Sequence, residues 1–365
     1  MYSEKISMLQ IGLLMASFFV AGAGLYYNGF LFQTVDYNPF VPLFSGLLLS
    51  FIPAGLAAWL CARYPRKNIL TMANELVGPF FGFLIVFPLV VAHFTLPLAI
   101  SRIASELIVD VYLEQTPPWA MTVVLLSISC WIATLGTEAV ARTNDEHLVI
   151  IFPLTMIMFL LSFSDIRPEL TRPYLQVDFS YWIQPEFYGS LLLFLSFTIV
   201  LFLNNSISHS TKIYRMIFGL KFIGAIYLFI TAYMILGTLG MEMAATFDQP
   251  LKVKMTTLRE TVFIERIDIF LVLLWLFPTV TSKAVLIVTG ARALGQWMSL
   301  PDYRRLVIIY YLVIITLSPL MLPFQHAKRT LLYLGPIWML YLTLILLILA
   351  VASLWKNPQK ASPRR

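Results

Sequence analysis

The chain has 365 residues, of which 59% are hydrophobic and only 12% are charged. Soluble domains carry about 25% charged residues, so this composition excludes an ordinary soluble protein. The net charge of +6 does not indicate nucleic-acid binding, because the basic residues are spread over many short segments with no long basic run.

Ten long apolar segments dominate the chain. Each has the length that a helix needs to cross about 30 Å of hydrocarbon, and none shows the alternation typical of a barrel strand. They cover residues 9–27, 39–61, 79–100, 119–135, 148–163, 187–203, 213–239, 267–288, 306–322 and 332–354. The pattern predicts an all-α membrane protein of about ten transmembrane helices. We expect one transporter-like domain over residues 1–355 and a basic cytoplasmic tail over residues 356–365.

The ten segments divide into two sets of five, over about residues 9–163 and 187–354. Because five is an odd number of crossings, the second set of spans must lie inverted in the membrane relative to the first, as in many secondary transporters. The first segment contains Gly22-Ala23-Gly24, which either unwinds to meet a ligand or allows close helix packing. The equivalent sixth segment carries Ser196 and Thr198, whose hydroxyls could simply bond to their own helix.

Loops on the side of the two termini hold more Lys and Arg than loops on the other side. This excess predicts that both termini are cytoplasmic. Between the second and third segments, Asn68 could cap a short helix with Ile69, Met72, Ala73 and Leu76 on one side, lying along the inner membrane surface. We expect further short helices in the outer loops 164–186 and 240–266.

The sequence shows no motif for nucleotide binding, zinc binding or nucleophilic catalysis. Cys61 and Cys130 lack a metal-ligand spacing, and the four histidines do not cluster. We therefore predict a protein that is not an enzyme and needs no cofactor or metal.

A few polar residues fall within or beside the apolar segments, where ionisable groups often serve function. His93 lies in the third segment, as a ligand-binding group or a neutral hydrogen-bonded link between helices. Lys221 and Lys283 are better explained by side chains that extend to the inner interface. Glu138 and Arg142, four residues apart at the inner end of the fourth segment, predict a structural ion pair.

Several segments together resemble the permease-like B subunit of spore germinant receptors, the GerAB family of the amino acid–polyamine–organocation superfamily. They are Gly22-Ala23-Gly24 and the stretches 64–82, 116–119, 136–142 and 263–275. The resemblance covers nearly the whole chain, and it rests on the order and spacing of these segments.

The resemblance implies a LeuT-like fold with a 5+5 inverted repeat and interrupted helices 1 and 6, in the inner membrane of a bacterial spore. It also implies a small nutrient ligand, an amino acid or similar molecule, and partner subunits of the A type and the lipoprotein C type. Ser196 and Thr198 stand where family members often have Gly and Glu, which removes a carboxylate. The expected ligand-binding residues are Gly22, Ala23, Gly24, His93, Leu195, Ser196, Phe197 and Thr198.

The favoured hypothesis is thus a nutrient-binding subunit that triggers germination by conformational coupling to its partners. One alternative is a proton- or sodium-coupled amino-acid symporter of the cell membrane. The other is a non-transporting scaffold subunit of the receptor complex.

Overall fold

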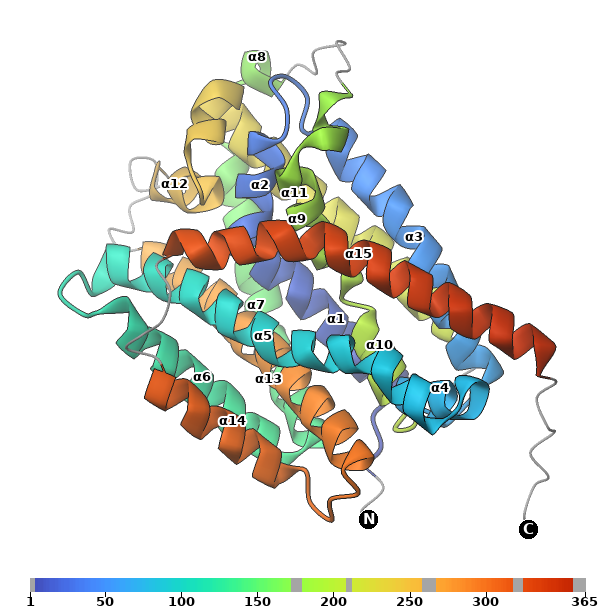
Figure 1. Ribbon diagram of the computed structural model, residues 1–365. Helices are drawn as coiled ribbons and strands as arrows, with labels where there is room; N and C mark the ends of the chain where they lie inside the picture. Colours follow the sequence, from blue (N-terminus) through green and yellow to red (C-terminus); the bar gives the residue numbers. More distant parts are fainter. Residues whose placement is uncertain (1–3, 172–178, 208–211, 258–266, 318–323, 357–365) are drawn as a thin grey trace.

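The computed structural model describes residues 4–171, 179–207, 212–257, 267–317 and 324–356, which form a bundle of helices (Figure 1). The helices are α1 (Met8–Gly22), η1 (Ala23–Tyr27), α2 (Asn28–Gln33), α3 (Phe40–Arg63), α4 (Ile69–Val77), α5 (Pro79–Tyr112), α6 (Pro118–Leu135), α7 (Thr137–Phe163), α8 (Pro168–Thr171), η2 (Ser180–Ile183), α9 (Pro185–Leu191), η3 (Leu192–Leu195), α10 (Thr198–Leu203), α11 (Ile213–Thr246), α12 (Pro250–Thr257), α13 (Ile267–Trp297), α14 (Arg304–Leu317) and α15 (Phe324–Trp355).

Each of the ten predicted apolar segments corresponds to a helix or a run of helices. Within the described residues, nine of these are long and apolar enough to cross a membrane. The tenth, α14, has 14 residues there, and its predicted continuation over 318–322 lies outside the described part of the chain. The all-α membrane architecture is therefore confirmed.

The fifth span begins earlier than the apolar pattern predicted. Its helix α7 starts at Thr137, whereas the apolar segment starts at residue 148. Gly136, with φ of 106°, ends α6 and makes the turn. Glu138 and Arg142 therefore lie in the first turns of the fifth span and not at the end of the fourth. Hydropathy marks the stretch that fits hydrocarbon, and a helix that extends beyond it is missed at that end.

Helices 1 and 6 are interrupted, as predicted, by short turns that are not α-helical. Helix 1 runs through α1, the π-helical turn η1 and α2. Helix 6 consists of α9, the 3₁₀ turn η3, a two-residue turn at Ser196-Phe197, and α10. Such departures from α-helical hydrogen bonding are frequent at functional sites in membrane helices.

The two most deeply placed spans are helix 6 and α13. The apolar windows of these spans are 78% and 89% buried inside the protein, more than those of the other spans. Helix α13 packs against α1, α5, α6 and α7, and α9 packs against α15. In Figure 1, α15 crosses the face of the bundle in front of α1 and α9. Helix 6 and α13 are thus enclosed by the rest of the bundle.

The two ends of the bundle differ in their short helices. The start of α1, the end of α15 and α4 lie toward one end, and α8 and α12 lie at the other (Figure 1). The predicted helix α4 is present: the Asn68 side chain accepts a hydrogen bond from the amide of Thr71 at 2.9 Å. Its predicted apolar side is buried, namely Ile69, Met72, Ala73 and Leu76.

Candidate functional site

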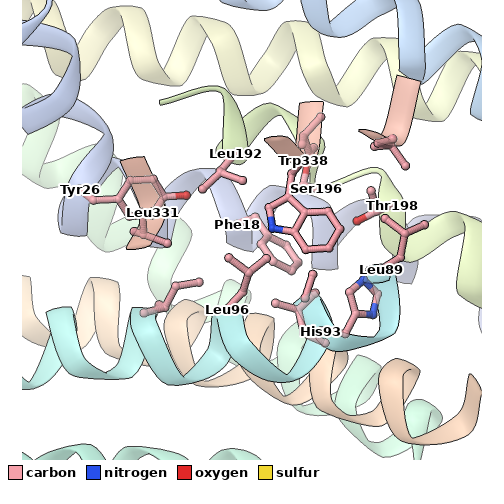
Figure 2. A pocket seen from close by; sticks show the side chains of 15 residues that line it. Phe18, Tyr26, Leu89, His93, Leu96, Leu192, Ser196, Thr198, Leu331 and Trp338 are labelled. Atoms are coloured by element: carbon pink, nitrogen blue, oxygen red, sulfur yellow. The ribbon is translucent and has the colours of Figure 1, made fainter. Parts of the chain in front are cut away.

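A cavity of about 60 Å³ lies between helix 1, helix 6, α5, α13 and α15. A single water needs about 10–15 Å³ measured in this way, so the cavity has room for more than one small group. Figure 2 shows the labelled side chains converging on it. Its walls are Phe18 and Tyr26 of helix 1, Leu192, Leu195, Ser196 and Thr198 of helix 6, Leu89, Ala92, His93, Leu96 and Ile100 of α5, Leu286 of α13, and Leu331, Trp338 and Leu342 of α15.

The lining is apolar with a few polar groups and contains no Asp, Glu, Lys or Arg. The His93 Nδ1 is 3.0 Å from the Thr289 hydroxyl on α13, so this histidine links two helices and also borders the cavity. Among the described residues, the Ser196 hydroxyl and the Trp338 indole N–H have no hydrogen-bond partner. Buried polar groups normally have partners, so two unpartnered groups on residues that line one cavity are an unusual feature.

The predicted ligand-binding residues divide into two groups. His93, Leu195, Ser196 and Thr198 line the cavity, whereas Phe197 is buried beside it. Their role in ligand binding stays a prediction.

The three residues of the helix 1 break pack against other helices. A Cβ atom at Gly22 would lie 2.4 Å from Leu193 Cδ1, and one at Gly24 would lie 2.6 Å from the Trp275 indole. The Ala23 amide donates hydrogen bonds to the carbonyl oxygens of Phe19 and Val20. In this conformation the glycines allow close helix packing, and their part in ligand binding stays a prediction.

The two intramembrane lysines do not extend to the interface, and that expectation was wrong. Both side chains are fully buried. The Lys221 Nζ donates to the Phe194 carbonyl oxygen at 2.7 Å, and the Lys283 Nζ donates to the Ser101 hydroxyl at 2.8 Å. Each finds a polar partner on a neighbouring helix, which hydropathy cannot reveal.

A set of contacts closes the bundle at the end where α1 begins; we call it the inner latch because that end is the predicted cytoplasmic side. Its carboxylate, Glu4, accepts hydrogen bonds from the amide and hydroxyl of Thr137 and lies 3.3 Å from Arg292 Nη1. Arg292 also donates to the hydroxyls of Thr137 and Ser206. The Ile6 amide donates to the Ser206 carbonyl at 2.9 Å. The latch therefore joins the start of helix 1 to α7, α13 and the end of helix 6.

A second set of contacts, the outer latch, closes the opposite end. Lys328 of α15 forms an ion pair with Asp248, just before α12, and donates to the Gln33 side chain at 3.0 Å. The Lys328 Nζ also lies 5.8 Å from the centre of the Phe30 ring. The cavity thus lies between two polar closures, each formed by segments far apart in the sequence.

Glu138 and Arg142 form the predicted ion pair, with 2.6 Å between Glu138 Oε1 and Arg142 Nη2. Their side chains are 40% and 68% exposed, so the pair stands at the surface of the protein. Exposed pairs of this kind contribute little to stability.

Two parts of the site escaped prediction. The α15 wall, with Leu331, Trp338 and Leu342, comes from a segment in which the sequence shows only apolar residues. The latch residues lie at helix ends, where Lys, Arg, Asp and Glu are expected in any membrane protein. Glu4 and Lys5 both stand directly before the first span, and the sequence does not show that Glu4 is the one that joins the latch.

A helical bundle with breaks in helices 1 and 6 beside a central cavity defines a transporter-like membrane protein of the LeuT type. Solved structures agree. The structure of MhsT in complex with L-phenylalanine matches with a TM-score of 0.70 at 12% identity, covering 94% of this chain and 98% of MhsT. Mhp1, a nucleobase-cation-symport-1 family transporter solved closed with bromovinylhydantoin bound, matches with a TM-score of 0.61 at 13% identity, covering 96% of this chain and 76% of Mhp1.

Sequence comparison shows the family of this chain. The family model for spore germination proteins of the permease type matches residues 5–325, and the chain belongs to this family. The spore germination protein YndE of Bacillus subtilis (strain 168) is 25% identical over 273 residues, covering 72% of this chain and 73% of YndE. The protein is therefore a transporter-like germination protein of the membrane.

Proposed function

We propose that this chain is the nutrient-binding subunit of a spore germinant receptor and acts from the spore inner membrane, with both termini on the core side. Its nutrient occupies the central cavity between helix 1, helix 6, α5, α13 and α15. The observation that carries the proposal is the cavity among the helices with two unpartnered polar groups, Ser196 and Trp338, in a member of the spore germination protein family.

The lining favours a small nutrient whose side chain is uncharged and largely apolar. A buried charge is costly unless another charge or several hydrogen bonds compensate it, and the cavity wall contains no carboxylate, ammonium or guanidinium group. An amino acid with an apolar side chain fits this wall. Its charged main-chain groups would then lie toward the backbone at the helix breaks, as in transporters of this architecture.

In this proposal the two latches carry the signal that the nutrient is bound. A ligand shifts a conformational equilibrium only by its difference in affinity for the two states. In the proposed mechanism the nutrient favours one arrangement of the latches, and partner subunits of the A type and the lipoprotein C type respond to it. Transport of the nutrient is not required for this response.

The direct test is binding to the purified full chain. Thermal unfolding is measured with L-alanine, L-leucine, L-phenylalanine, L-aspartate and L-lysine, each over a range of concentrations. We expect a rise in midpoint only with the apolar amino acids. Equal stabilisation by L-aspartate or L-lysine contradicts the assigned nutrient class, and no stabilisation by any ligand favours a scaffold.

Variants then locate the site. Ser196→Ala and Trp338→Phe should each weaken binding about fivefold to tenfold, the effect of losing one hydrogen bond. Ser129→Ala and Trp131→Phe serve as matched controls: Ser129 bonds within its own helix, and Trp131 is exposed. Spores carrying Ser196→Ala should need more nutrient for the same response, with the maximal response unchanged. Uptake of the labelled amino acid into proteoliposomes would instead support a symporter.

A further inference from the structure

A lysine of α11 lies beside the break in helix 6. Lys221 of α11 is fully buried, and its Nζ donates to the Phe194 carbonyl oxygen at 2.7 Å. Phe194 belongs to η3, the 3₁₀ turn that interrupts the helix. The lysine therefore contacts the backbone at the point where α-helical hydrogen bonding stops.

The rest of the lysine environment is also suited to a cation. The Nζ lies 5.5 Å from the centre of the Phe194 ring and 5.1 Å from the centre of the Phe197 ring. Aromatic faces within about 6 Å attract an ammonium group, most strongly where water is excluded. Within the described ranges, no carboxylate lies within 4.0 Å of the Lys221 Nζ. One carbonyl oxygen and two rings thus surround the charge.

In broken-helix transporters, exposed carbonyl oxygens and the carboxyl ends of half-helices coordinate a diffusible cation such as Na⁺. Here the ammonium group of the chain already contacts a carbonyl oxygen of the break. The partial negative charge at the end of the α9–η3 half-helix is placed to favour it.

We propose that Lys221 is a tethered cation that holds the helix 6 break in its 3₁₀ form, so that this break needs no sodium ion. Lys221 then acts as a positioning residue for the cavity, because the residues directly after Phe194 include Leu195, Ser196 and Thr198 of its wall. The inference stands whether or not the cavity binds a nutrient.

The test measures thermal unfolding of the purified full chain without nutrient, in NaCl and in choline chloride at equal ionic strength. The wild-type midpoint should be the same in both salts. Lys221→Met should unfold about 2–4 °C lower in choline chloride. Na⁺ or methylammonium should restore part of that loss, because either small cation can occupy the vacated position.

Lys283→Met is the matched control, since Lys283 is an equally buried lysine that bonds to a side-chain hydroxyl away from the break. It should lose stability without recovery by either cation. The proposal is overturned if the wild type is stabilised by Na⁺, if Lys221→Met is as stable as wild type in choline chloride, or if both variants recover equally. If Lys221→Met does not accumulate, Lys221→Gln is measured in its place. If neither neutral variant accumulates, Lys221→Arg is made, because it keeps the positive charge. The proposal requires Lys221→Arg to accumulate in the membrane, and it is overturned if this variant does not.

Discussion

The outer latch offers a sharp test of how the cavity opens, because a glycine of α2 sits against its backbone. A Cβ atom added at Gly29 would lie 2.1 Å from the Asp248 carbonyl oxygen, whereas ordinary van der Waals contact begins at 3.4 Å. The Asp248 oxygen belongs to the backbone, so no flexible side chain can move away from the new Cβ atom. Gly29→Ala must therefore separate α2 from residue 248 by more than about 1 Å.

That displacement acts on the latch itself. Asp248 is the carboxylate that pairs with Lys328, and its second contact, with the Gln33 side chain, is already at 3.5 Å. Overpacking of this kind costs about 1–3 kcal/mol. If the cost falls on the closed state alone, the population that is open at this end rises roughly 5-fold to 150-fold, at about 1.4 kcal/mol for each factor of ten.

The assay is the labelling rate of a cysteine placed at Leu331, which is 1% exposed and lines the cavity one turn beyond Lys328. The purified protein is treated with a polar thiol reagent, and the background from Cys61 and Cys130, both buried, is measured in the parent chain. Gly29→Ala should raise the rate at least about fivefold.

Gly219→Ala is the matched control, because a Cβ atom there meets nothing within 4 Å. It should leave the labelling rate of Leu331→Cys unchanged. If Gly29→Ala accumulates normally and also labels at the parent rate, residue 248 does not control access to the cavity, and the latch reasoning is refuted.

Three further outcomes are expected. Gly24→Ala should lower the free energy of unfolding by about 1–3 kcal/mol, measured by thermal unfolding, because the new Cβ meets an indole ring at 2.6 Å; an unchanged midpoint would contradict this close packing. Glu138→Gln or Arg142→Met should each change stability by less than about 0.5 kcal/mol, since the pair is exposed; a loss of protein from the membrane would show a structural role. Glu4→Gln should open the inner latch and speed labelling of Thr198→Cys while leaving Leu331→Cys slow; equal acceleration of both would indicate general loosening.

The spans could be predicted because crossing hydrocarbon imposes a length and a composition that the sequence must carry. The same holds for α4, where one cap residue and four apolar positions specify a short amphipathic helix. The breaks were foreseen from Gly22-Ala23-Gly24 and from the family resemblance. Their geometry was not, since a π turn and a 3₁₀ turn depend on which neighbours pack against the backbone. Gly24 faces Trp275, which is distant in sequence, and no local pattern reveals that contact.

The cavity wall was predicted in part for a related reason. Helix 6 residues could be placed there because the family resemblance points to that part of the span. The α15 wall carries no such mark: Trp338 is one aromatic residue among many, and aromatic residues also gather at membrane interfaces. Lys221 was misjudged because a lysine in an apolar segment can reach water when it lies near a span end. Its true partner, a carbonyl oxygen, belongs to another helix and is invisible to hydropathy.

The connection between the cavity and the inner latch is short, as the proposed sensing role requires. Ser196 borders the cavity, and Ser206, ten residues further along the chain and just after helix 6, accepts a hydrogen bond from Arg292 in the latch. Between them, Asn204 donates to the carbonyl oxygens of Tyr64 and Lys67, which precede α4. A ligand that moves Ser196 therefore acts on a buried segment already joined to the latch and to α4. Because packed helices transmit displacement with little compression, a small shift at the break would reach the end of the bundle that holds the inner latch, where the proposed function places the response of partner subunits.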